Sequence, residues 1–203
     1  MGLTVIALGI DPGTHDGAAA YIDAGPGLPR VVAVAAWVRY TRAKLHRAKV
    51  LVWVGGDVLV SEAPDGLGCS AALGALHPLL HVAPDVAAVE RMIPHGDTAR
   101  QSLIVLGEAA GEAVAWCRRR HGVEPLRVTA GEWRRTVGVP ARPARLCAHT
   151  ARALVGDRTS EVRTGVRVVG LPQTLADIDH VADACLIADH ARIVARAGRR
   201  DIA

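Results

Sequence analysis

The sequence predicts an α/β domain built on one mixed sheet of five strands, with helices flanking the sheet. Half of the 203 residues are apolar, aromatic residues make up 3%, and Phe is absent, so Val, Leu, Ile and Ala must form the core. Such a core is typical of α/β proteins. Three apolar runs with short connections come first and predict an antiparallel meander. Strand and helix patterns then alternate, which predicts parallel strands added to the same sheet.

The first half of the chain supplies the meander and one further strand. We expect the meander strands at residues 3–10, 17–23 and 28–40, and a short buried strand at 86–90. The segment between them is ambiguous. Residues 49–63 fit a hairpin that turns at Gly55, Gly56 and Asp57, and residues 69–80 are weakly helical.

The second half is expected to be mainly helical. A long helix is predicted at 98–121, with Thr98 as its N-cap, followed by a strand at 125–130 and a short helix or turn at 131–139. Further helices are expected at 142–156 and 174–198, separated by a loop at 157–172. We therefore predict one domain over residues 1–197 with an insertion at about 41–84, and a short C-terminal tail at 198–203.

Charge and cysteine content limit the classes of function. The net charge is +4, and eleven Arg but only four acids lie between Arg118 and Arg163. That stretch fits either a solvated surface or a phosphate-binding face. The four cysteines form no Cys-x-x-Cys pair, which argues against a zinc site. Without a signal-peptide pattern or a run of about 20 apolar residues, we expect a cytoplasmic protein that does not enter a membrane.

Carboxylates close two of the predicted strands. Asp11 follows the first apolar run and precedes Pro12 and Gly13, and Glu90 ends the strand at 86–90. Neighbouring strand ends in a mixed sheet can bring two such side chains within a few Å of each other. Taken alone, Asp11 also fits an ordinary turn residue.

The final helix offers Asp179, His180 and Asp183, and spacings of three and four residues place side chains on one helical face. Clustered carboxylates repel one another, and a divalent cation removes that penalty. Oxygen ligands favour Mg²⁺ or Mn²⁺ over zinc. The joint pattern therefore predicts a metal site. The same helix carries an apolar stripe suited to the sheet: Val181, Ala184, Cys185 and Ala188.

Four segments in chain order resemble the RuvC family of Holliday-junction resolvases. "GIDPGT" is similar to the motif with the first catalytic Asp, here Asp11, and "VAAVE" to the motif with the catalytic Glu, here Glu90. "LGEAAG" at 106–111 resembles the family's Leu-Gly-x-Ala-x-Gly helix segment. "HVADACLIA" resembles the closing motif, whose positions here are His180 and Asp183. The resemblance runs from residue 5 to about 193, and 41–84 is unmatched in detail.

This resemblance implies an RNase H-like fold and a metal-dependent endonuclease, from a cell or a phage, that hydrolyses phosphodiesters in four-way or otherwise branched DNA. It implies paired cuts by a homodimer, leaving 5′-phosphate and 3′-OH ends. It also implies two Mg²⁺ ions per site, with Mn²⁺ able to substitute, held by Asp11, Glu90, His180 and Asp183. Branch-migration or other recombination proteins would be further partners.

The DNA contacts depart from the family pattern. Where the family has an aromatic wedge after the Glu, this chain has Met92 and Ile93, which we predict to enter between bases. The family's basic positions correspond here to arginines, which are predicted to bind phosphates: Arg134, Arg135, Arg142 and Arg145.

Three alternatives stay open at this point. A flap or branch nuclease of the same fold would carry the same residues, and a branched-DNA-binding module could have lost catalysis. Asp179 could also take the place of His180 as the metal ligand. A sugar-kinase or actin fold shares an Asp-x-Gly-Thr turn, but the chain has no second phosphate loop and no Walker-type loop.

Overall fold

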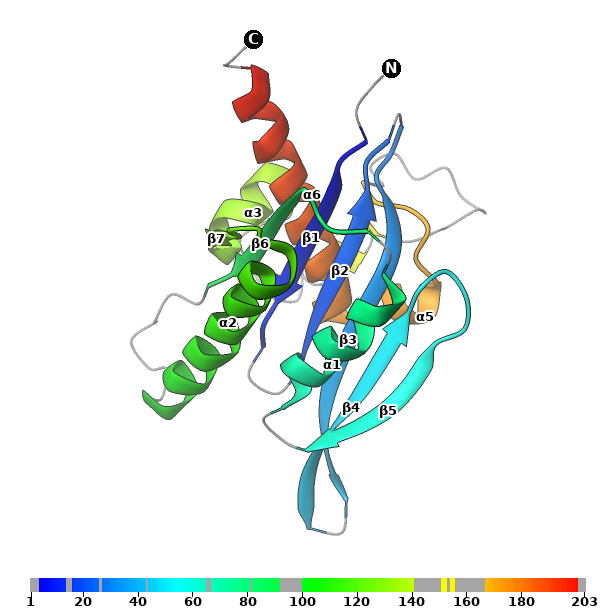
Figure 1. The fold of residues 1–203 in the computed structure, drawn as a ribbon, viewed down its shortest axis with the longest axis vertical. Coiled ribbons are helices and arrows are strands. Elements are labelled where there is room, and N and C mark those ends of the chain that lie inside the picture. The colour runs from blue at the N-terminus through cyan, green and yellow to red at the C-terminus, as the bar shows by residue number, and fades with distance from the viewer. Residues whose placement is uncertain are drawn as a thin grey trace.

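The computed structural model contains one seven-stranded sheet in the order β5-β4-β3-β2-β1-β6-β7 (Figure 1). It describes residues 4–13, 16–25, 27–42, 44–64, 67–80, 82–91, 100–140, 151–152, 154–155 and 167–200. The strands are β1 (Ile6–Asp11), β2 (Gly17–Asp23), β3 (Arg30–Arg42), β4 (Leu45–Trp53), β5 (Leu59–Pro64), β6 (Val86–Glu90) and β7 (Leu126–Val128).

The strand directions confirm the predicted mixed sheet. Strands β1 to β5 form an antiparallel meander, while β6 pairs with β1 and β7 pairs with β6 in parallel. The expected number of five strands was wrong. The segment at 41–84, which no family motif matches, contains the hairpin β4–β5. This hairpin extends the sheet by two strands.

Helices cover both faces of the sheet, as predicted (Figure 1). One face packs against α6 (Asp179–Arg200), with α3 (Ala130–Val137) and α5 (Gln173–Ala176) beside it. The other face packs against α1 (Gly68–Leu76), which continues into the short 3₁₀ helix η1 (His77–Leu79), and α2 (Arg100–His121). Alternate residues of each strand enter the two cores, because successive side chains of a strand point to opposite faces.

Close contact between β1 and α6 fixes the position of the last helix. A Cβ at Gly9 would overlap the carbonyl oxygen of Ala184 and the main-chain nitrogen of Ala188. The apolar stripe predicted for this helix is fully buried against the sheet: Val181, Ala184, Cys185 and Ala188. The missing side chain at Gly9 thus lets the helix backbone lie directly on the central strand.

Several helix boundaries differ from those expected. The predicted final helix is broken, because the chain turns at Asp177 and Ile178 between α5 and α6. Gly198 does not end α6, which continues to Arg200. The proposed N-cap Thr98 and most of the helix expected at 142–156 lie outside the described residues. None of the helices in the described ranges has the length and apolar character needed to cross a membrane.

Candidate metal-dependent active site

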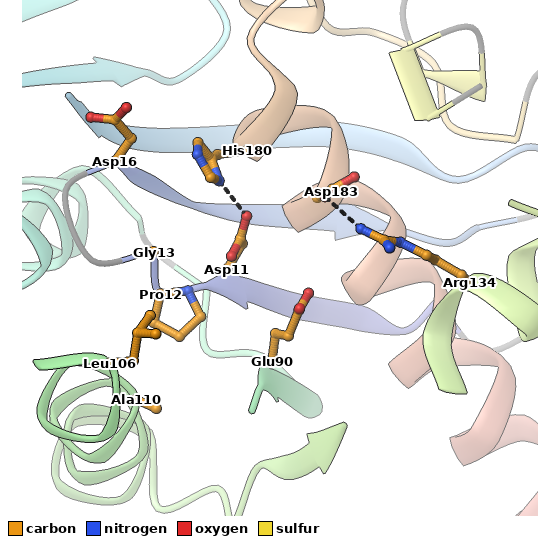
Figure 2. Close-up of a pocket in the computed structure, with 10 residues that line it drawn as sticks. All are labelled: Asp11, Pro12, Gly13, Asp16, Glu90, Leu106, Ala110, Arg134, His180 and Asp183. Atoms are coloured by element: carbon orange, nitrogen blue, oxygen red, sulfur yellow. Dashed lines mark hydrogen bonds and ion pairs between the residues drawn. The ribbon is translucent and has the colours of Figure 1, made fainter. Parts of the chain in front are cut away.

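Two carboxylates meet at one edge of the sheet because they end neighbouring parallel strands. Asp11 is the last residue of β1, and Glu90 is the last residue of β6. Both line a pocket of about 400 Å³ at this edge (Figure 2). The pocket is lined by Asp11, Pro12, Gly13, Asp16, Glu90, Leu106, Ala110, Arg134, His180 and Asp183.

The first turns of α6 add two more chemical groups to the pocket. His180 Nδ1 lies 2.6 Å from Asp11 Oδ2 and donates a hydrogen bond to it, and Asp183 lies one helical turn further on (Figure 2). Asp179 does not line the pocket; it is more than half exposed and pairs with Arg152 at 3.1 Å. In this arrangement His180, and not Asp179, faces the carboxylates of the strands.

The turn after β1 holds Asp11 in place. Pro12 is buried, and a Cβ at Gly13 would overlap the carbonyl oxygen of Asp16. Asp16 in turn accepts a hydrogen bond at 2.8 Å from the main-chain nitrogen of Arg39 in β3. Asp16 lines the pocket, although no sequence motif singled it out. The turn is therefore joined to the meander as well as to the strand that precedes it.

Burial and mutual repulsion perturb the acids of this site. Burial, and after it the nearby charge of Asp11, raises the pKa of Glu90 to about 8. The hydrogen bond from Trp133 opposes this rise. Burial likewise raises the pKa of Asp183 to about 7, with Asp11 adding to the rise and Arg134 opposing it.

His180 carries the compensating positive charge. Its hydrogen bond with Asp11 raises the pKa of the imidazole to about 9, although burial acts in the opposite direction. The ordinary pKa near 6.5 that a free imidazole has is therefore not the value at this position. At neutral pH the ring is protonated and balances the charge of Asp11.

A short helix, α3, approaches the site from the side. Thr129 caps it and forms a reciprocal capping box with Glu132. From this helix, the fully buried Trp133 donates a 2.8 Å hydrogen bond from Nε1 to Glu90 Oε2. Arg134 lies 3.7 Å from Asp183 (Figure 2). Its guanidinium also lies over the ring of Trp133. Trp133 was not among the predicted site residues, although the Thr129-x-x-Glu132 pattern indicates where its helix begins.

Of the basic and apolar residues expected to bind DNA, one lines the pocket, one does not, and four lie outside the described residues. Arg134 lines the pocket, whereas Arg135 is exposed and does not. Leu106 and Ala110, from the "LGEAAG" segment, form the apolar wall that α2 contributes. The remaining four residues expected to contact DNA lie outside the described residues: Met92, Ile93, Arg142 and Arg145.

The donor set fits a hard divalent cation. Four carboxylates, Asp16 among them, and one imidazole line a single pocket, and burial together with the charge of Asp11 raises the pKa values of Glu90 and Asp183. Within the described ranges, no three His, Cys, Asp or Glu side chains are placed so that they could hold an ion directly. Holding a cation with three of these groups would therefore require side-chain rotation.

Comparison with known proteins gives structural similarity but no family assignment. No protein-family model and no curated protein matches the chain. A structure of T. thermophilus RuvC in complex with Holliday junction substrate matches with a TM-score of 0.49 and 16% identity, over 97% of each chain. A second structure, of Thermus thermophilus RuvC, matches with a TM-score of 0.44 and 15% identity, also over 97% of each chain. At these low values, the function has to be inferred from the residues of the pocket.

Proposed function

We propose that this chain is a metal-dependent endonuclease that resolves branched DNA, with four-way junctions as its main substrate. The observation that carries the proposal is the convergence of Asp11, Glu90, His180 and Asp183 on one pocket. These are the positions at which the sequence resembles the RuvC catalytic motifs. They come from two strand ends and one helix that are far apart in the sequence.

The acidic residues would hold the cation. Asp11, Glu90 and Asp183 offer carboxylate oxygens, and His180 offers a ring nitrogen once it has lost its proton. We expect Mg²⁺, with Mn²⁺ able to substitute, and two ions per site. When bound, such ions supply an activated water and charge stabilisation at the phosphate.

Hydrolysis adds water across the bond between phosphorus and the 3′ oxygen. The water oxygen forms the new bond to phosphorus and loses a proton, and the departing 3′ oxygen gains one. The products are 5′-phosphate and 3′-OH ends. Arg134 is suited to contact the phosphate, because it lines the pocket and its contact with Asp183, at 3.7 Å, is long.

The wider assembly follows from the same proposal. A homodimer with two-fold symmetry would match the approximate symmetry of a four-way junction, so that two pockets could cut two strands. Branch-migration or other recombination proteins would act together with such an enzyme.

Cleavage of labelled DNA tests the proposal directly. A four-way junction, a flap and a linear duplex of the same sequence are incubated with the protein, with Mg²⁺ or with EDTA. Paired nicks in the junction that need Mg²⁺ support a resolvase, and preferred cutting of the flap would show a branch nuclease instead. Tight junction binding without cleavage in either Mg²⁺ or Mn²⁺ would show a binding module and overturn the catalytic proposal.

A further inference from the structure

A long hairpin projects beyond the edge of the sheet at which the active-site pocket lies. The first residue of β2, Gly17, pairs with Trp37, and β3 continues past it to Arg42 while still paired with β4. Five residues per strand therefore extend past β2, which corresponds to roughly 17 Å. Figure 1 shows this hairpin as the lowest part of the sheet. We name residues 38–49 the basic hairpin.

The basic hairpin is strongly and uniformly charged. Its sequence, "VRYTRAKLHRAK", contains five Lys or Arg and no acid. The side chains of Lys44, Arg47 and Lys49 are exposed. Arg47 is neutralised by Glu62 of β5 at 2.9 Å, but no ion pair of either lysine is found among the described residues.

One face of the basic hairpin lies on the same side of the sheet as the side chain of Asp11. Asp11 points to the face covered by α6, since it lies two residues after Gly9, which contacts that helix. Lys49 pairs with Val38, and Val38 lies two residues after Ala36, which belongs to the core on the α6 side. Lys49 and Asp11 thus point to the same side of the sheet.

The base of the basic hairpin is also joined to the pocket. The main-chain nitrogen of Arg39 donates its hydrogen bond to Asp16, which lines the pocket. The hairpin is therefore held at a fixed position relative to the acids.

We propose that the basic hairpin binds the phosphates of a duplex arm that leaves the active site. The proposal rests on the proposed nuclease function and assigns a role to a segment that no family motif matches. A projection of roughly 17 Å spans about half a helical turn of duplex DNA. Because contacts to phosphate do not read base edges, this binding would favour no particular sequence.

Two charge-removing variants test the proposal by salt-dependent binding to a four-way junction. The first combines Lys44→Asn with Lys49→Gln; Asn is chosen because residue 44 has a positive φ of 65°. The matched control combines Arg119→Gln with Arg120→Gln. Both residues are exposed and lie near the C-terminal end of α2, which precedes β7 and is remote from the basic hairpin. Arg47 is left unchanged because it pairs with Glu62, so that removing it would alter the charge balance on β5 as well.

Each lost phosphate contact lowers the slope of log affinity against log salt by about 0.9. For the hairpin variant, the magnitude of this slope should therefore be smaller by about 1.8. The ratio of wild-type affinity to variant affinity should then fall about 12-fold when the salt concentration rises from 50 to 200 mM. The control should behave as wild type. At saturating enzyme, the single-turnover cleavage rate of the hairpin variant should equal that of wild type, since neither lysine lines the pocket.

The outcomes separate the two proposals. If wild type binds and cleaves the junction but the hairpin variant shows the same affinity and slope, the hairpin proposal is wrong and the nuclease proposal stands. An equal loss in both variants would show general charge attraction and would also overturn it. If wild type neither binds nor cleaves branched DNA, the nuclease proposal itself fails.

Discussion

Trp133 Nε1 lies 2.8 Å from Glu90 Oε2, so a fully buried aromatic side chain holds one of the carboxylates of the pocket. Hydrogen bonding to a carboxylate favours its charged form and counteracts the rise in the pKa of Glu90. The indole thus does two things: it fixes the direction of Glu90 and keeps it closer to the ionisation state that a cation needs.

Replacing Trp133 with Phe tests this role. The variant keeps most of the packing but loses the donor, so the pKa of Glu90 should rise further above 8. A rise of one unit would weaken the apparent Mg²⁺ affinity of cleavage about tenfold at pH 7 and less at pH 9. Trp116→Phe, in the opposite core, is the matched control and should leave the Mg²⁺ titration unchanged. A Trp133→Phe variant with unchanged Mg²⁺ affinity would mean that the indole only fills space.

Asp11→Asn should abolish cleavage and leave junction binding largely intact. Asp11 is the acid whose charge acts on both Glu90 and Asp183, so it lies at the centre of the proposed cation site. Gel-shift titration in EDTA measures binding, and cleavage in Mg²⁺ measures activity. Undiminished nicking by a nuclease-free preparation of the variant would rule out the site.

The burial of Asp183, together with the nearby charge of Asp11, predicts a pH-dependent gain in stability for Asp183→Asn. In the absence of metal, Asp183 keeps its proton up to a pKa of about 7 in the folded protein, whereas the unfolded chain releases it near pH 4. The free energy of unfolding therefore falls as pH rises from 4 to 7. Asn removes this loss, so the variant should be more stable than wild type at pH 8 by on the order of 2 kcal/mol.

Urea unfolding in EDTA at pH 4 and pH 8 measures this difference, which should be small at pH 4. Adding Mg²⁺ at pH 8 should stabilise wild type far more than the variant, because only wild type keeps the full set of ligands. A variant less stable than wild type at pH 8 in EDTA would show that the carboxylates do not destabilise the fold.

Because His180 is protonated at neutral pH, we expect the affinity of the site for a cation to rise with pH. With a pKa of about 9, His180 stabilises the metal-free fold below pH 6.5, and this contribution is lost as pH rises through 9. A cation must displace the proton, so the apparent Mg²⁺ affinity should increase from pH 7 to pH 9. His180→Asp should retain partial cleavage and show a shallower dependence above pH 8. If His180→Ala cleaves as fast as wild type at every pH, the imidazole serves only packing.

Comparing substitutions at two neighbouring arginines of α3 distinguishes a contact with the reacting phosphate from a general effect of surface charge. Arg134 lines the pocket and Arg135 does not, so Arg134→Ala should lower the single-turnover cleavage rate of bound junction by at least tenfold. Arg135→Ala should change only the salt dependence of binding, or nothing. Equal single-turnover rates for the two variants would contradict a contact between Arg134 and the reacting phosphate.

Local patterns were enough to predict most of the pocket. Asp11 and Glu90 end runs of apolar residues, and a parallel pair of strands brings such ends together. His180 and Asp183 are one helical turn apart and share a face, and that spacing is visible in the sequence alone. The contribution of Trp133 was not predictable, because it depends on how α3 packs against the sheet.

The extent of the sheet was harder to predict for a similar reason. The sequence correctly predicted a hairpin of two strands at 49–63. No pattern within that segment, however, indicates that β4 pairs with the end of β3. The break at Asp177 and Ile178 was also missed, since the apolar spacing continues across it from Leu175 to Val181. Long-range pairing and packing decided both features.

The direct contact between Gly9 and the backbone of α6 sets the dimensions of the pocket. Because main chain rests on main chain there, no side chain separates β1 from α6 at this point, one turn of α6 beyond Asp183. Adding a single methyl group at residue 9 should push the helix away from the strand and widen the separation. The position of His180 and Asp183 relative to Asp11 thus depends on the absence of a side chain at residue 9.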